Sequence, residues 1–150
     1  MSAVVVTADL NAPPAEVWDV VMDPHQLERW VTIHRKLTHA DDGPPRVGYR
    51  MGQRYVIRGA PVKVSWELEA MDPPHSADWA GHGPAGAGAA ITYRLEPLDG
   101  GSRTRFHYSN TFSAPGGRLG AVASRALMGG VPEREAHASL ARLSEVIDAR

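Results

Sequence analysis

One long amphipathic segment follows a series of strand-like segments, and this order limits the folds that the chain can adopt. A strand pattern at Val4 to Leu10 opens the chain, and two short helical patterns lie between Pro13 and Val31. Strand-like segments then extend from about residue 33 to residue 112. The last segment, from about residue 118 to residue 149, carries an apolar helical stripe. A lone helix of that length has to bury its stripe, and the preceding strands offer the large surface for it.

Alternation of apolar and polar residues identifies the strands. It is clearest in the segment 62–70, and it recurs on both sides of the hairpin signal Asp99-Gly100-Gly101. This pattern predicts an antiparallel sheet with one buried and one solvated face. The predicted inward set comprises Ile33, Arg35, Leu37, His39, Met51, Gln53, Tyr55, Ile57, Val62, Val64, Trp66, Leu68, Ala70, Ile91, Tyr93, Leu95, Phe106, Tyr108, Asn110 and Phe112.

The closing segment has a helical period. Its apolar residues after Pro132 are spaced by four, three and four, which places Ala136, Leu140, Leu143 and Ile147 on one helix face. The pair Gly129-Gly130 comes before this stripe and is expected to kink or split the helix.

Composition narrows the class of protein. The chain has 150 residues, of which 43% are hydrophobic, and we expect one domain over residues 1–150. The net charge of -1 is spread along the chain, so we expect no nucleic-acid partner. The lack of cysteine removes disulfides, thiolate nucleophiles and cysteine metal sites. The sequence has neither a signal peptide nor an apolar run of about 20 residues, so we expect a cytoplasmic protein without a membrane span.

The order of elements and several motifs resemble the START/polyketide-cyclase superfamily (SRPBCC). The motifs are residues 12–18 (APPAEVW), Asp23-Pro24, residues 94–104 (RLEPLDGGSRT) and the tail with Leu140, Leu143 and Ile147. The resemblance implies an α+β helix-grip fold. In that fold a curved antiparallel sheet of about six or seven strands wraps a long C-terminal helix, and two short helices follow the first strand. We expect the first strand at the edge of the sheet or beside the last strand.

The resemblance implies a cavity between sheet and helix, and two functions remain open. The first is binding of a hydrophobic or aromatic small molecule, polyketide-like or lipid-like. The second is an enzyme of the polyketide cyclase or dehydratase type, in which polar groups orient a reactive chain and move protons. A partner-binding module has no exposed apolar pattern to support it. The resemblance implies no cofactor, and the sequence leaves the ligand and the oligomeric state open.

Eight residues are candidates for ligand binding, seven on predicted inner faces and Trp79 on a weaker strand. A polar Asn110 in register with Phe106 and Tyr108 needs a hydrogen-bond partner, which a ligand oxygen or nearby backbone could supply. Arg35 could bind an acidic oxygen or extend to water at the rim. The aromatic residues could stack on a flat ligand or form core. The eight are Arg35, Gln53, Tyr55, Trp66, Trp79, Tyr93, Tyr108 and Asn110.

No catalytic residue can be assigned from the sequence. Cyclases of the family place an Arg, a Tyr and an Asn around the cavity, which Arg35, Tyr55 or Tyr93, and Asn110 match by type alone. His39 and His75 are candidate general bases because imidazole titrates near neutral pH. We expect no metal site, because the histidines do not form a ligand motif. They lie at positions 25, 34, 39, 75, 82, 107 and 137.

Overall fold

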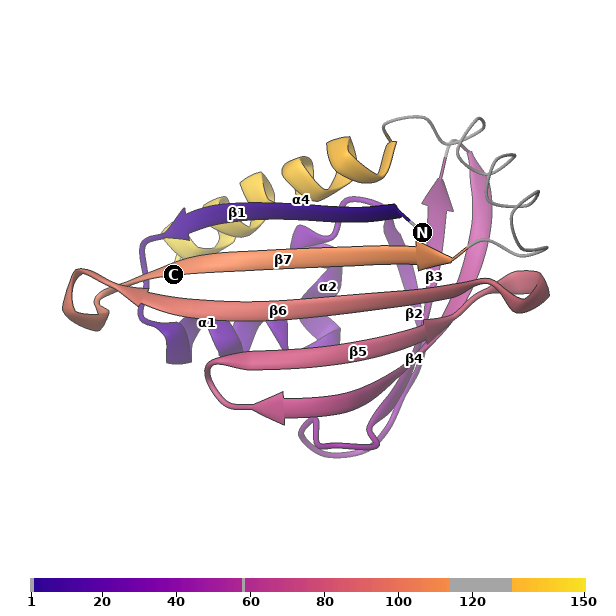
Figure 1. Cartoon of the computed structure of the whole chain (residues 1–150), viewed down its shortest axis with the longest axis horizontal. Coiled ribbons are helices and arrows are strands. Elements are labelled where there is room, and N and C mark those ends of the chain that lie inside the picture. Colours follow the sequence, from indigo (N-terminus) through magenta and orange to yellow (C-terminus); the bar gives the residue numbers. More distant parts are fainter. Residues whose placement is uncertain (1, 58, 114–130) are drawn as a thin grey trace.

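The computed structural model describes residues 2–57, 59–113 and 131–150, which form one antiparallel sheet with helices on one side (Figure 1). Within these residues the sheet has seven strands in the order β1-β7-β6-β5-β4-β3-β2. The elements are β1 Ser2–Leu10, α1 Pro14–Val21, η1 Pro24–Gln26, α2 Leu27–Trp30, β2 His34–Ala40, β3 Arg50–Ile57, β4 Ala60–Asp72, β5 Ser76–His82, η2 Pro84–Gly86, β6 Gly88–Leu98, η3 Asp99–Gly101, β7 Arg103–Ser113 and α4 Val131–Asp148. The α+β helix-grip prediction is confirmed.

The first strand lies at the edge of the sheet and beside the last strand, as expected. β1 pairs antiparallel with β7 from Ser2 opposite Phe112 to Leu10 opposite Thr104, without a register shift. Inward residues of β1, such as Val4, Val6 and Leu10, are buried, whereas Val5 between them is 67% exposed. One face of this edge strand therefore belongs to the core and the other contacts solvent.

Helix α4 closes the buried face of the sheet. The predicted stripe is buried, with Ala136, Leu140, Leu143 and Ile147 each less than a tenth exposed. The helix packs on β1 and on α2, and Figure 1 shows it behind the strands on the same side as α1 and α2. The expectations for residues 118–130, including the glycine pair, and for the side chain of Phe112 lie outside the described residues.

Polar contacts fix both ends of α4. In its first half, the backbone N–H of Thr32 donates to Ser139 Oγ at 3.1 Å, and Thr32 Oγ1 donates to Glu135. At its C-terminal end, Asn11 Nδ2 donates to Asp148 Oδ1 at 3.0 Å. The helix is thus held by the turn after α2 and by the chain that leaves β1.

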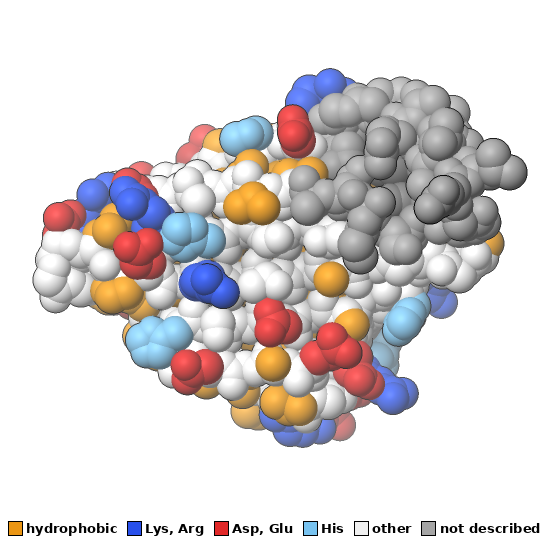
Figure 2. Space-filling model, in the orientation of Figure 1, with side chains coloured by type: hydrophobic (Ala, Val, Ile, Leu, Met, Phe, Trp, Pro, Cys, Tyr) orange, Lys and Arg blue, Asp and Glu red, His pale blue; other side chains and the backbone are white. Residues whose placement is uncertain are grey.

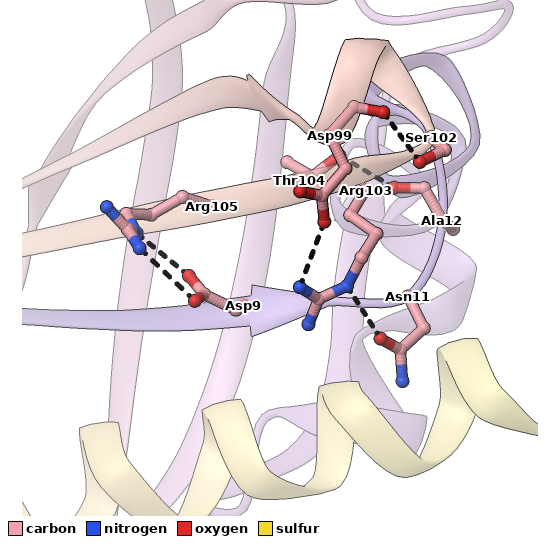
Figure 3. Close-up of polar contacts among 8 residues, drawn as sticks. All are labelled: Asp9, Asn11, Ala12, Asp99, Ser102, Arg103, Thr104 and Arg105. Carbon is pink, nitrogen blue, oxygen red and sulfur yellow. Dashed lines mark hydrogen bonds and ion pairs between the residues drawn. The ribbon is translucent and has the colours of Figure 1, made fainter.

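The turn from β1 into α1 is held by β7 (Figure 3). Thr104 is fully buried, and its Oγ1 donates to the Ala12 carbonyl at 2.8 Å. Next to it Arg103 Nε donates to Asn11 Oδ1 at 3.0 Å, while Arg105 and Asp9 form an ion pair across the two strands. Pro14 then begins α1, where its missing N–H leaves no hydrogen bond unmade.

Three predicted inward positions are wrong because the strands contain bulges. Strand β2 shifts register against β3 between His34 and Lys36 and again between Leu37 and His39. The extra residues reverse the alternation, so Arg35 and His39 are exposed rather than inward. A shift between Leu68 and Ala70 in β4 exposes Ala70 in the same way.

The outer face of the sheet carries charges of both signs. Figure 2 shows acidic, basic and histidine side chains interspersed over the strands, with scattered apolar groups between them. Pairs such as Arg50 with Glu67 and His107 with Glu96 contribute to this pattern. This mixed, solvated surface contrasts with the apolar face beneath it.

Candidate functional site

The candidate site is the buried face of the sheet, where polar groups lie among apolar ones. On β6 and β7, Tyr93 pairs with Tyr108 and Ile91 with Asn110, so these four side chains share one face. Asn110 is partly buried, and its Nδ2 donates to the Tyr108 hydroxyl at 3.4 Å. That distance makes the bond weak. The predicted inward register of Tyr108 and Asn110 is confirmed.

A second polar group occupies the same face on β2 and β3. Gln53 is only 2% exposed, and its Oε1 accepts the Tyr55 hydroxyl proton at 2.8 Å. Its Nε2 lies 2.9 Å from His34 Nδ1. Because the Gln53 amide nitrogen is a donor, Nδ1 accepts and the neutral imidazole carries its proton on Nε2. We refer to His34, Gln53 and Tyr55 as the β2–β3 chain.

Trp66 covers the middle of this face. Its ring occupies the space above Gly81, where a Cβ atom would lie 2.6 Å from the ring. The indole is buried, and its N–H has no hydrogen-bond partner among the described residues. A buried donor without a partner is costly in an ordinary core and more common where a ligand or water binds.

An aromatic cluster adjoins the polar groups. Tyr93 lies 5.4 Å from Phe106, 6.1 Å from Tyr108 and 6.1 Å from Trp30, measured between ring centroids. These tilted arrangements are the favoured geometry of aromatic pairs. Trp79 is also buried, and it packs edge-on against Tyr49, with 6.3 Å between the ring centroids.

The buried tyrosines remain protonated at neutral pH. Burial raises the pKa of Tyr108 to about 12, and the Asn110 bond opposes this rise. Burial also raises the pKa of Tyr55 and of Tyr93 above the usual phenol value, and the neighbouring Tyr108 adds to both increases. The nearby indole N–H of Trp66 partly opposes this increase in the pKa of Tyr55, although the indole makes no hydrogen bond of normal geometry. Each phenol is therefore a hydrogen-bond donor and not a tyrosinate base.

His34 is neutral at the same pH. Burial lowers its pKa below the usual histidine value, and the negative charge of Glu28 only partly opposes this effect. The described part of this face thus presents neutral donors and one neutral imidazole, without a charged side chain. Such a surface suits an uncharged ligand that carries oxygen acceptors.

The structure brings together most of the predicted site residues. Seven of the eight lie on the buried face: Gln53, Tyr55, Trp66, Trp79, Tyr93, Tyr108 and Asn110. Arg35 does not, because of the β2 bulge. His39 and His75 are exposed and lie off this face. Sequence reasoning missed His34, whose inward position depends on that same bulge.

Metal ligation and membrane insertion find no support in the described residues. No group of three or more of their histidine, aspartate and glutamate side chains is arranged to hold a metal ion. None of the described helices has both the length and the apolar character to cross a bilayer.

Known proteins with similar sequences and structures agree with this fold. An uncharacterized protein of Mycobacterium tuberculosis is 30% identical over 133 residues, which cover 87% of this chain and 92% of the relative. A second protein of that organism, named as a toxin, is 23% identical over 125 residues, or 83% of this chain and 87% of the relative.

Among solved structures, an aromatase/cyclase from Streptomyces sp. R1128 superposes with a TM-score of 0.82 at 18% identity, covering 99% of this chain and 94% of that chain. A Mycobacterium smegmatis protein gives a TM-score of 0.68 at 25% identity, covering 98% of this chain and 91% of that chain. Residues 1–148 match the family described as polyketide cyclase / dehydrase and lipid transport. The chain belongs to this family.

Proposed function

We propose that the protein binds a hydrophobic or aromatic small molecule, polyketide-like or lipid-like, against the buried face of the sheet. The observation that carries this proposal is the set of neutral polar groups inside an apolar surface. The Tyr108 hydroxyl accepts a weak bond from Asn110, but among the described residues its own proton has no acceptor. A ligand oxygen would provide one.

The chemistry of the face suggests which ligands would bind. Protonated phenols at Tyr93 and Tyr108 favour ligands with carbonyl or other acceptor oxygens, because a phenol whose pKa lies well above neutral pH keeps its proton and can donate it in a hydrogen bond. The Tyr55 proton is already donated to Gln53. The adjoining rings of Trp66 and Tyr93 would contact a planar or aliphatic body. Site residues for this proposal are Gln53, Tyr55, Trp66, Trp79, Tyr93, Tyr108 and Asn110.

The direct test is native mass spectrometry with a panel of aromatic polyketides and fatty acids. We expect at least one panel member to bind, and we expect Asn110→Leu to weaken that binding by about 1 kcal/mol or more, the scale of one net hydrogen bond. Folding stability should change little, because leucine suits the apolar neighbours. The matched control is Ser109→Ala, the adjacent position on the opposite face of β7.

Two outcomes would contradict this proposal. Intact binding with a large loss of stability in Asn110→Leu would make Asn110 a structural residue. If the protein is folded and no member of the panel binds, the buried face is ordinary hydrophobic core and not a ligand site.

An enzyme of the cyclase or dehydratase type is the second candidate, and His34 is the observation that favours it. His34 Nδ1 accepts from the Gln53 amide in this structure, so a substrate would first have to displace that bond. The neutral, half-buried imidazole could then remove a proton from carbon next to a carbonyl. The resulting enolate carbon would bond to a second carbonyl carbon, whose oxygen would take a proton from a phenol such as Tyr108. Loss of that hydroxyl with a neighbouring hydrogen would release water.

Product analysis separates the two candidates. A carrier returns its polyketide ligand with unchanged mass, whereas a cyclising dehydratase returns it lighter by one water. His34→Gln should abolish conversion but not binding if the imidazole is the base. Conversion at an unchanged rate in that variant would exclude His34 from the role.

A further inference from the structure

The position of the Trp66 indole depends on the strand beside it. The atoms nearest to the place that a Cβ on Gly81 of β5 would take are Cε3, Cζ3 and Cη2, all in the benzene ring of the indole. The five-membered ring, which carries the N–H, therefore lies farther from β5. It lies near the Tyr55 hydroxyl on β3, where it partly opposes the effect of burial on the pKa of Tyr55. Gly81 thus allows the close approach that sets where this donor lies.

The Trp66 N–H is buried without a hydrogen bond. The residue is only 4% exposed, and Nε1 has no acceptor among the residues that the structure describes. The nearby Tyr55 hydroxyl already donates to Gln53 at 2.8 Å. A donor buried without an acceptor destabilises the folded protein, so an acceptor supplied from outside the chain would bind here favourably.

A second donor without an acceptor lies on the same face. Tyr108 on β7 accepts a weak bond from Asn110 at 3.4 Å, but in the described part of the chain its own proton has no acceptor. After burial, the neighbouring Tyr108 is the next cause that raises the pKa of Tyr55 and of Tyr93. The Tyr108 hydroxyl and the Trp66 indole therefore both lie near Tyr55, and the proton of neither is used.

The face between these two donors is open to solvent. Ala89 on β6 pairs with Gly81, which pairs with Trp66, so two small residues separate Trp66 from β7 in this row of the sheet. Four residues of β6 and β7 face inward but are only partly buried: Ala89, Ile91, Tyr108 and Asn110. A small molecule can therefore reach this part of the face without displacement of core side chains.

We infer that the Trp66 N–H and the Tyr108 O–H together bind one carbonyl oxygen of the ligand, and that they select ketones over hydrocarbons of the same shape. This inference rests on the proposed function, because it assigns the groups that select the ligand on the buried face. A carbonyl oxygen has two lone pairs and can accept both hydrogen bonds at once. A hydrocarbon would leave both donors unpaired and shielded from water, and such a loss is the basis of strong selectivity in polar sites.

The test compares two probes that differ in one group, 2-acetylnaphthalene and 2-ethylnaphthalene, with the full chain. Two-dimensional NMR follows the indole N–H signals of the four tryptophans during each titration. We expect the ketone to bind about tenfold more tightly than the hydrocarbon, which corresponds to one or two net hydrogen bonds. The ketone, and not the hydrocarbon, should move the Trp66 indole proton signal downfield.

Matched variants assign this preference to its donors. Trp66→Phe keeps an aromatic ring without the N–H, and Tyr108→Phe removes only a hydroxyl group, so each should reduce the ketone preference about fivefold. Trp18→Phe is the same exchange as at Trp66, made at a partly buried residue of α1, and it should leave the preference unchanged. If Trp66→Phe does not fold, Tyr108→Phe and the indole signal of the wild type still decide the question.

The outcomes separate this inference from the proposed function. Equal affinity for the two probes, or an unchanged ketone preference in both variants, would overturn the inference and leave the binding function in place. So would a Trp66 indole proton whose signal is already at a hydrogen-bonded position without a probe. If neither probe binds while a fatty acid of the panel does, the carbonyl site is wrong. If nothing binds to the folded protein, the proposed function and the inference are both wrong.

Discussion

The two halves of the sheet are built differently. In the half formed by β1, β7 and β6, the strands pair without a register shift, and all eleven residues of β6 face partners on β7. In the half formed by β5, β4, β3 and β2, the pairing shifts at three places, two between β2 and β3 and one between β4 and β5. We call these the regular half and the bulged half.

The difference determines which side chains meet inside the protein. Regular pairing brings residues two apart to the same face, as with Tyr108 and Asn110. In β2 the bulges bring His34 opposite Tyr55 and Leu37 opposite Gln53, so residues three apart both turn inward. A polar chain of imidazole, amide and phenol forms there. The regular half supplies packing and the bulged half supplies the connected hydrogen bonds.

The largest effect is expected when a buried core side chain in the regular half is truncated. Phe106 is fully buried, so Phe106→Ala should cost about 3–5 kcal/mol of unfolding free energy through lost burial and a cavity. Urea denaturation followed by circular dichroism measures this. The control is Ser109→Ala on the outer face of β7. A loss of unfolding free energy below about 1 kcal/mol, the size of an average substitution, would mean that neighbouring side chains move to fill the space left by the ring.

A tight contact between β5 and β4 should give the next largest effect. Because a Cβ at position 81 would lie 2.6 Å from the Trp66 ring, Gly81→Ala should cost about 1–3 kcal/mol through overpacking. Trp66→Phe removes the ring atoms concerned. The double variant should therefore be more stable than the sum of the single losses indicates. Strict additivity in urea denaturation would show that Trp66 can move away without cost.

Breaking the β2–β3 chain should cost a similar or smaller amount. Gln53→Leu leaves the buried Tyr55 hydroxyl without its acceptor, and an unsatisfied buried group costs about 1–3 kcal/mol. Adding Tyr55→Phe removes that hydroxyl and should recover part of the loss. If the double variant loses the full sum in the same unfolding assay, the bond between the two residues contributes nothing to stability.

The smallest effect concerns pH. Burial lowers the pKa of His34, so between its folded value and the usual histidine value near 6.5 the unfolded chain binds more protons. Stability should therefore fall as the pH drops below about 6.5, and the His34 contribution should be absent above it. The difference between wild type and His34→Gln, measured by urea denaturation at neutral and at mildly acidic pH, isolates this contribution. A difference that does not vary with pH would contradict it.

The sequence predicts the regular half better than the bulged half, for a physical reason. Burial of one face sets the order of apolar and polar residues along a strand or helix, and this order can be read directly from the sequence. It gives the alternation in the segments 91–95 and 106–110 and the apolar stripe from Ala136 to Ile147. A bulge at Arg35 or near Ala70 adds one residue without a distinctive composition, so the predicted faces are wrong after it.

The pairing of β1 with β7 has a consequence for how the chain folds. Val4 lies opposite Asn110 and Leu10 opposite Thr104, separations of 106 and 94 residues. Ribosomes make the N-terminal strand first, so it has no partner until about a hundred later residues have been synthesised. Closing such long loops costs entropy before any pairing repays it, which slows folding. Docking of the first strand is therefore expected among the last steps of folding.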